Sequence, residues 1–430
     1  MSNVIEADLT WTGPQFETGI QVEIDAAGRI ARVGRLGLQS TARLRGQALL
    51  PGMVNVHSHA FQRGLRGKGE RFPAGAGSFW TWREAMYQLV TTLDEEGFYR
   101  ISLQAFREML ASGITTVGEF HYFHHSAGKR DFAYDQVIRR AARDAGIRLV
   151  LLESYYRTGG VGLPLGTAQL RFETVSPAAF WEQVDRIQST LDAARESLGV
   201  APHSLRAATP EEIAVLHAEA TRRGLVVHIH VEEQWKEIED CVTGYGKPPM
   251  ALLNDVLGTT RNVTAVHCTH TAPGDLAAFL EGGGTACLCP LTEGNLGDGI
   301  ADLPGILAAG GRFCLGSDSN ARISWPEEMR WLEYVQRLRS ENRGVLRAPD
   351  GALASVLFRA ATEAGAAALG VPAGAVVPGA WADFACLDLT APSLAGWEVD
   401  TLMDAFVFGS DQSAIAESWV GGRRVYSGHQ

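Results

Sequence analysis

Four short apolar segments of this 430-residue chain each end in a histidine or an aspartate. They are Val56-His57-Ser58-His59, Val227-His228-Ile229-His230, Val266-His267 and Leu315-Gly316-Ser317-Asp318. Apolar runs of this length are typical of strands buried in a parallel sheet. In a parallel β/α barrel all strands end at one face, so strand ends that are far apart in the sequence come together there. The pattern predicts a barrel with histidines and an aspartate clustered at its mouth.

Strands and helices alternate through the middle of the chain, which favours a parallel sheet. Predicted strands cover residues 53–57, 114–119, 147–152, 204–208, 225–231, 263–267, 285–289 and 312–316. Predicted helices cover residues 94–112, 133–145, 177–198, 210–223, 274–282 and 354–369. Segments 60–92 and 155–176 are expected to be long loops that build or cover the site. This order predicts an α/β fold, a (β/α)8 TIM barrel over residues 51–374.

Both ends of the chain carry strand patterns of a different kind. Residues 18–24 and 29–34 alternate apolar and polar side chains about a turn at residues 25–28, and residues 383–387 form another strand. Residues 417–420 and 423–426 predict a hairpin about Gly421-Gly422. We expect the strands of both termini to pair into one small β domain made of residues 1–50 and 375–430.

The histidine spacing indicates which side chains share a face. His57 and His59 lie two residues apart, so on a strand both point the same way. Of the pair His228 and His230, only one need be a ligand, and His230 lies nearest the strand end. Each position alone has a plainer explanation, such as a buried histidine bonded to a neighbour, but four such strand ends favour a metal site. Three further histidines are interpreted as loop residues rather than a second metal site: His121, His124 and His125.

Charge and composition exclude several classes of protein. The net charge of −11 argues against a nucleic-acid partner, because phosphate binding needs a basic face. The sequence has no uncharged apolar run of about eighteen residues and no signal-peptide core, so neither a membrane span nor secretion is expected. Six cysteines, mostly inside apolar runs, are typical of buried free thiols. A cytoplasmic protein is therefore predicted.

Two motifs resemble the amidohydrolase superfamily. Residues 50–59 are similar to its first-strand motif, and residues 380–384 resemble the returning strand of its small domain. The resemblance implies a distorted barrel with a β-sandwich built from both termini. Binuclear members use a carboxylated lysine on a middle strand, whereas none of the four lysines here lies at a predicted strand end: Lys68, Lys129, Lys236 and Lys247. One zinc ion per subunit is expected, with Fe²⁺ as the alternative metal.

The arrangement of the strand ends resembles the deaminase branch of that superfamily. The metal ligands implied by the resemblance are His57, His59, His230 and Asp318. Asp318 would also act as general base, His267 would hydrogen-bond the attacking water, and Glu233 would carry protons to the leaving nitrogen. The alternative for Glu233, which lies three residues beyond His230, is a solvated loop acid.

Five further residues lie in segments expected near the barrel mouth: Gln62, Arg83, Tyr122, His203 and Arg206. A buried guanidinium favours a carboxylate partner, so the two arginines could hold one carboxylate. The other three residues could hold a second carboxylate by hydrogen bonds. The plainer alternative for the arginines is an internal salt bridge, for example with Glu84 or Glu233. Together the five residues suit a small dicarboxylate better than a flat aromatic ring.

The same segments resemble the formimidoylglutamate deiminase family of histidine degradation. In that family the counterparts of Gln62, Tyr122 and His203 bind the α-carboxylate of N-formimino-L-glutamate, and those of Arg83 and Arg206 pair with its side-chain carboxylate. The resemblance implies a homodimer that releases N-formyl-L-glutamate and ammonia. Two alternatives stay open. One is a nucleobase or other aromatic aminohydrolase on the same scaffold, and the other is a non-catalytic barrel protein.

Overall fold

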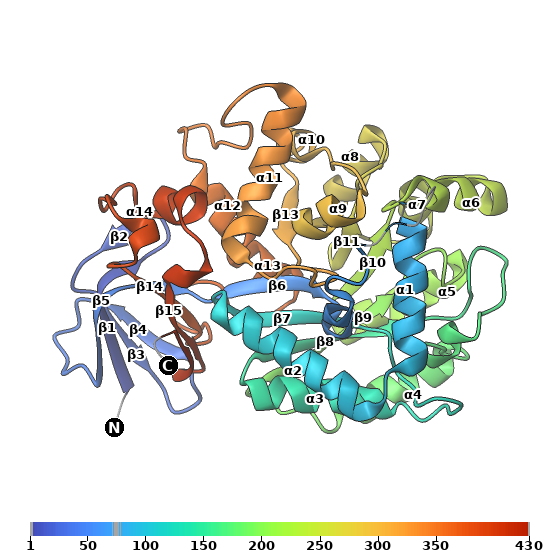
Figure 1. Cartoon of the computed structure of the whole chain (residues 1–430), viewed down its shortest axis with the longest axis horizontal. Helices are drawn as coiled ribbons and strands as arrows, with labels where there is room; N and C mark the ends of the chain where they lie inside the picture. Colours follow the sequence, from blue (N-terminus) through green and yellow to red (C-terminus); the bar gives the residue numbers. More distant parts are fainter. Residues whose placement is uncertain (1–2, 71, 73–76, 78, 429–430) are drawn as a thin grey trace.

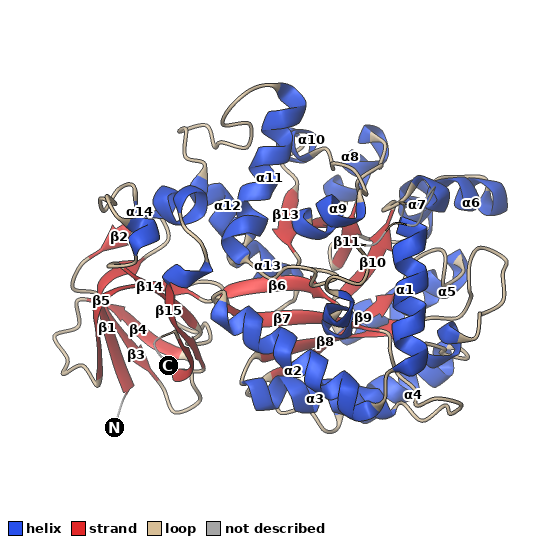
Figure 2. Ribbon diagram, viewed as in Figure 1, coloured by secondary structure: helices blue, strands red, loops and turns tan. Residues whose placement is uncertain are grey.

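The computed structural model, which describes residues 3–70, 72, 77 and 79–428, arranges the chain around two sheets. Figure 1 shows the larger sheet with its helices on the right and the smaller sheet on the left, where both chain ends lie. Figure 2 shows the strands of the larger sheet inside a shell of helices. The strands of the predicted strand–helix alternation therefore form one parallel sheet, and the helices cover it.

The larger sheet is a barrel of eight parallel strands in sequence order. The strands are β6 (Met53–Ser58), β7 (Ile114–His121), β8 (Arg148–Tyr155), β9 (Glu196–Pro202), β10 (Val227–Val231), β11 (Val263–His267), β12 (Thr285–Leu288) and β13 (Arg312–Leu315). A bridge between Ser58 and Asp318 joins the first and last strands. The barrel therefore closes at the strand ends that carry the first and last predicted metal ligands.

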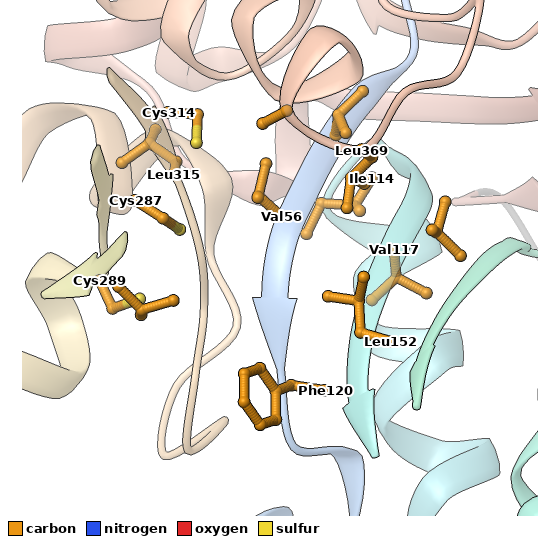
Figure 3. Close-up of a cluster of buried hydrophobic side chains, with 14 of the residues drawn as sticks. Val56, Ile114, Val117, Phe120, Leu152, Cys287, Cys289, Cys314, Leu315 and Leu369 are labelled. Atoms are coloured by element: carbon orange, nitrogen blue, oxygen red, sulfur yellow. The ribbon is translucent and has the colours of Figure 1, made fainter. Parts of the chain in front are cut away.

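Apolar side chains pack this seam. Figure 3 shows Val56 of β6 with Cys314 and Leu315 on one side and Val117 and Leu152 on the other. All five side chains are fully buried, and all six cysteines of the chain are buried and free. Val56 also packs close to Gly365 on the helix layer, so it faces outward and its neighbour His57 faces the barrel interior.

The helices surround the barrel. They are α1 (Phe79–Thr92), α2 (Glu95–Ala111), α3 (Ala133–Ala145), α4 (Pro177–Gln188), α5 (Pro210–Arg223), α6 (Trp235–Tyr245), α7 (Pro249–Val256), α8 (Pro273–Glu281), α9 (Pro290–Leu296), α10 (Leu303–Ala308), α11 (Trp325–Ser340), α12 (Ala354–Ala360), α13 (Glu363–Ala368) and α14 (Leu402–Asp404). The start of α5 was predicted correctly, because Thr209 and Glu212 form a reciprocal capping box. Within the described ranges, every helix is too short or too polar to cross a lipid bilayer.

Several predicted elements are wrong in position or type. The helix predicted over 177–198 ends at Gln188, and the strand predicted over 204–208 is instead β9, which pairs with β8 from Glu196 to Pro202. The amides of residues 207 and 208 both bond the Ser204 carbonyl, so this stretch is a tight turn. The helix predicted over 354–369 is two helices. The segment 60–92, expected to be a loop, contains a 3-10 helix (Ala60–Leu65) and α1.

The smaller sheet unites the two ends of the chain, as predicted. Its strands are β1 (Asn3–Trp11), β2 (Phe16–Glu17), β3 (Gln21–Ile24), β4 (Ile30–Gly34), β5 (Ala42–Pro51), β14 (Phe384–Asp388), β15 (Ile415–Val420) and β16 (Arg423–Ser427). The central strand β5 pairs with β1 on one side and with β14 on the other. Gly421 and Gly422 both have positive φ, which allows the tight β15–β16 hairpin. A separate apolar cluster fills this domain.

Candidate active site

Four ligand atoms meet at the mouth of the barrel. The Nε2 atom of His230 lies 3.1 Å from that of His57 and 3.3 Å from that of His59. Oδ1 of Asp318 lies 3.1 Å from His57 Nε2 and 3.3 Å from His59 Nε2. These residues come from the ends of β6, β10 and β13, and all four are buried. The four predicted metal ligands thus lie together.

Backbone carbonyls orient two of the three imidazoles. Nδ1 of His59 donates to the Phe120 carbonyl at 2.9 Å, and Nδ1 of His230 donates to the His203 carbonyl at 2.9 Å. With the proton held on Nδ1, the lone pair of each ring lies on Nε2 and faces the cluster, as metal-binding histidines require. Burial lowers the pKa of all three histidines, that of His57 to about 3, so the rings are neutral.

The four atoms fit a zinc ion. A tetrahedral zinc with bonds of about 2.0–2.1 Å places its ligand atoms about 3.3 Å apart, close to the distances between these four atoms. Burial opposes ionisation of Asp318, but the hydrogen bond from His57 and the nearby histidines lower its pKa, so the carboxylate is available as a ligand. All four lysines are exposed and lie outside the barrel strands, so none of them takes part in this cluster.

The backbone is strained where the strands end at this site. Glu232, His267, Cys268, Asp318 and Asn320 all have φ between 46° and 76°, in the left-handed region that disfavours side chains. The strain at Asp318 is held in place by hydrogen bonds, since its amide donates to the His57 carbonyl at 2.9 Å and its carbonyl accepts from the His59 amide at 2.9 Å. Strain that surrounding contacts maintain is typical of functional sites.

His267 faces the metal cluster with a free ring nitrogen. Its Nδ1 lies 3.4 Å from Oε1 of Glu293, and its buried Nε2 has no hydrogen-bond partner among the described residues. The same Nε2 lies 3.8 Å from Oε1 of Glu233. Burial alone would lower the pKa of His267, but Glu233, Glu293 and Asp318 raise it to about 10. Glu233 is buried, so it is not the solvated loop acid of the alternative prediction.

A second group of polar side chains lies directly beside the metal cluster. Nε2 of Gln62 donates to the hydroxyl of Tyr122 at 2.6 Å, and Oε1 of Gln62 is buried without a described partner. The ring of Tyr122 is 4.9 Å from that of His59, and the ring of His203 is 4.7 Å from that of His230. His203 lies just beyond the end of β9, and this position lets it reach the mouth.

The two predicted arginines lie farther out along the same cavity. Nε of Arg83 on α1 donates to the hydroxyl of Tyr87 at 2.7 Å. Nη2 of Arg206 lies 3.4 Å from Oε2 of Glu233, and its Nε is buried without a described partner. The internal salt bridge left open for Arg206 is therefore present, with Glu233. For Arg83 no ion pair is described with Glu84, so that alternative is not supported.

One cavity with an empty volume of about 540 Å³ joins both groups. It is lined by His59, His230, Glu233, Asp318 and all five predicted substrate-binding residues, together with Phe79, Trp82, Met86, Tyr87, Tyr156 and Phe172. Sequence reasoning missed the other α1 side chains of this cavity, although Tyr87 has the i, i+4 spacing from Arg83 that places both on one helix face. It also missed Tyr156, which the strand-end rule identifies because it follows β8 directly.

The fold and this centre define a metal-dependent hydrolase of a known class. The sequence profile of the Amidohydrolase family matches residues 48–425, and the chain belongs to that family of hydrolases acting on C–N bonds. The chain is 42% identical over 412 residues to a formimidoylglutamate deiminase of Pseudomonas aeruginosa, with 94% of this chain and 90% of the relative covered.

Two further comparisons agree with this family. A 5-methylthioadenosine/S-adenosylhomocysteine deaminase of Natronomonas pharaonis is 28% identical over 384 residues, covering 88% of this chain and 80% of the relative. The crystal structure of an amidohydrolase from Brucella melitensis is similar with a TM-score of 0.91 and 36% identity, covering 99% of this chain and 95% of that one. The predicted distorted barrel with a terminal β domain is thereby confirmed.

Proposed function

We propose that this protein is a formimidoylglutamate deiminase of histidine degradation. It hydrolyses N-formimino-L-glutamate: water adds to the formimino carbon, the C–N bond to the terminal nitrogen breaks, and N-formyl-L-glutamate and ammonia leave. The observation that carries the proposal is a single cavity containing a metal-ligand cluster, the Gln62–Tyr122 pair and two guanidinium groups. The 42% identity to the Pseudomonas aeruginosa enzyme supports the same substrate.

One zinc ion in this site, with Fe²⁺ as an alternative, would be held by the four converging ligands, His57, His59, His230 and Asp318. Bound there, the metal would act as a Lewis acid and lower the pKa of water to roughly 7. Metal content also tests the enzyme assignment itself. Carefully purified protein that binds no metal would favour the non-catalytic barrel alternative.

Three residues of the chain would move or hold protons. Asp318 accepts a proton from the attacking water, since its carboxylate is ionised and lies among the ligands. His267 presents Nε2 toward the same space and stabilises the charge that develops there, while Glu293 holds its other nitrogen. Glu233 lies 3.8 Å from His267 and passes a proton to the departing nitrogen.

The substrate carries two carboxylates, and the cavity offers two matching groups of donors. Gln62, Tyr122 and His203 abut the metal ligands, so they suit the α-carboxylate, which is close to the formimino group. Arg83 and Arg206 lie farther out and also line a neighbouring cavity, so they suit the side-chain carboxylate. Guanidinium groups bind carboxylates in bidentate fashion, which fixes the orientation of the substrate.

The contact between Arg206 and Glu233 links substrate binding to the contacts of the Glu233 side chain. A carboxylate that binds Arg206 competes with Glu233 for the guanidinium, because their contact is only 3.4 Å and not an optimal hydrogen bond. Binding of the correct dicarboxylate would therefore free the Glu233 carboxyl group to contact the leaving nitrogen.

The test is ammonia release from N-formimino-L-glutamate measured beside guanine, cytosine and adenosine. We expect turnover of the formimino compound alone, because a flat ring leaves both arginines without a carboxylate. N-formiminoglycine, which lacks the side-chain carboxylate, is the matched substrate control and should react slowly. Activity on a base or nucleoside without activity on the formimino compound would overturn the proposal in favour of an aromatic aminohydrolase.

A homodimer in the cytoplasm completes the proposal. The family resemblance supports the dimer, and the cysteine usage supports the compartment. Light scattering on the purified protein should give twice the mass of the chain. A mass of one chain at micromolar concentration would contradict the dimer without affecting the reaction.

A further inference from the structure

A second group of ligand-type side chains lies outside the barrel, behind β7. Side chains alternate along this strand. Phe120 faces inward, with its ring 4.4 Å from that of His230. His121 faces the opposite way, toward the helix layer, where its ring is 6.1 Å from that of Phe98 on α2. Asp135 on α3 faces His121 from that layer. This group is thus separated from the active site by the barrel wall.

Three ligand atoms converge there. Oδ1 of Asp135 lies 3.1 Å from Nε2 of His121 and 3.0 Å from Nδ1 of His124. Each of these side chains is fully or almost fully buried, and the three atoms lie within 4.8 Å of one another. The spacings match those of the ligand atoms in the active-site cluster, which are 3.1–3.3 Å.

Glu153 supplies a fourth candidate ligand. Its environment is also independent evidence that this group lacks a binding partner. It is paired with His121 in the β7–β8 register, and its Oε1 lies 3.5 Å from Nδ1 of His124. Glu153 is fully buried, yet neither of its carboxylate oxygens has a hydrogen-bond partner among the described residues. A buried carboxylate without a partner is costly, so it requires a proton or a cation.

The two carboxyl groups of the cluster favour binding of a divalent cation. Asp135 and Glu153 bring two carboxyl groups into the interior, where burial and the neighbouring Asp135 raise the pKa of Glu153 well above its usual range. Arg139 is the nearby cation that acts on Glu153, but its guanidinium is paired with Glu196 at 2.7 Å. No described lysine or arginine forms an ion pair with either carboxylate within the cluster. One divalent ion would take the place of the proton on Glu153 and neutralise both carboxylates.

Further hydrogen bonds orient the ligands as they do around bound metals. Nε2 of His124 donates to the Ser154 carbonyl at 2.9 Å, which leaves the Nδ1 lone pair facing the cluster. Nε2 of Gln183 on α4 donates to Oδ2 of Asp135 at 2.6 Å, which leaves Oδ1 facing the two histidines. Partners that fix the tautomer of a histidine and the rotamer of a carboxylate are typical of metal sites.

We propose that His121, His124, Asp135 and Glu153 form a second, structural site for a divalent first-row cation such as zinc. Two imidazoles and two carboxylates suit that ion. The site joins the end of β7 to α3, and Tyr122 of the proposed substrate-binding group follows His121 directly. Its role is to hold this strand end in place, and it takes no part in the reaction. The proposal does not depend on which substrate the active site takes.

The first measurement locates zinc in the wild-type protein. Chelated protein is dialysed against zinc chloride, its zinc content is measured by mass spectrometry, and crystals are examined by anomalous scattering at the zinc edge. We expect two zinc ions per chain and two anomalous peaks, one of them between His124 and Asp135. A single peak, at the His57 cluster only, would overturn the proposal, because the buried group would then hold a proton in place of the cation.

Variants then test the ligands. Asp135→Asn keeps the shape of the side chain but removes a negative ligand, so the zinc content should fall from two to one with the active-site peak retained. His125→Gln is the matched control, because His125 is buried next to His124 but its ring nitrogens contact the backbone of Glu173 and Phe132. The control should keep two zinc ions. Persistence of the second ion in Asp135→Asn would contradict the assignment, and if that variant does not fold, the wild-type anomalous map decides.

Discussion

Replacing Arg206 tests whether this residue acts by binding the substrate carboxylate or by its contact with the proton carrier Glu233. Its side chain is 12% exposed, its Nε is buried without a described partner, and its Nη2 contacts Glu233. Arg206→Met keeps the apolar stem and removes the charged fork. Loss of one partner of a buried charge pair costs about 2–4 kcal/mol. At about 1.36 kcal/mol per factor of ten, kcat/KM for N-formimino-L-glutamate should fall about 30- to 900-fold.

The substrate control identifies the origin of this loss. With N-formiminoglycine there is no side-chain carboxylate to bind, so Arg206→Met should change kcat/KM little. Arg206→Lys, which keeps the charge but not the bidentate geometry, should give an intermediate loss with the dicarboxylate. Ammonia release is followed with a coupled dehydrogenase assay, and zinc content is measured for each variant. Equal losses with both substrates would refute the reasoning, because Arg206 would then act only through Glu233.

Three other changes test the site and the fold. Glu233→Gln should keep the metal but lose about 10²- to 10⁴-fold in turnover, and near wild-type ammonia release would exclude it as the proton carrier. Asp318→Asn should be inactive even in samples whose metal analysis shows zinc; retained turnover would rule out its role as base. Gly118→Ala places a Cβ 2.5 Å from the Val56 carbonyl oxygen, so the free energy of unfolding in urea should fall by about 1–3 kcal/mol or more. Gly258→Ala, where a Cβ meets nothing within 4 Å, is the control, and an equal loss there would contradict the packing argument.

The metal cluster was predictable from the sequence because its information is local. His57 and His59 have the two-residue period that places both side chains on one face of a strand. Parallel strands all end at the same edge, so apolar runs that end in histidine or aspartate meet there without further assumptions. For the same reason Tyr156, one residue past the end of β8, could have been predicted. It was missed only because the predicted strand, residues 147–152, ends before β8 does.

Other errors arose where local signals are ambiguous. The segment Glu196–Pro202 follows a helix and mixes polar and apolar residues, so its pairing with β8, rather than its own pattern, makes it a strand. The placement of His203 and Arg206 beyond this strand follows from that pairing. Helix α1 lies next to the cavity, and its polar side chains obscure the apolar period of a core-facing helix.

By itself, the sequence determined the barrel, the domain built from both termini and the clustering of His57, His59, His230 and Asp318, since each depends on strand periodicity and on the shared edge of parallel strands. Only the tertiary structure decided which partner each charged group has. Arg206 contacts Glu233, His267 contacts Glu293, and Asp135 lies between His121 and His124. These contacts join side chains from different elements whose approach depends on helix packing, and the backbone pattern of any one segment does not encode such distances. The two buried carboxylates behind β7 therefore became a candidate cation site only in the folded chain.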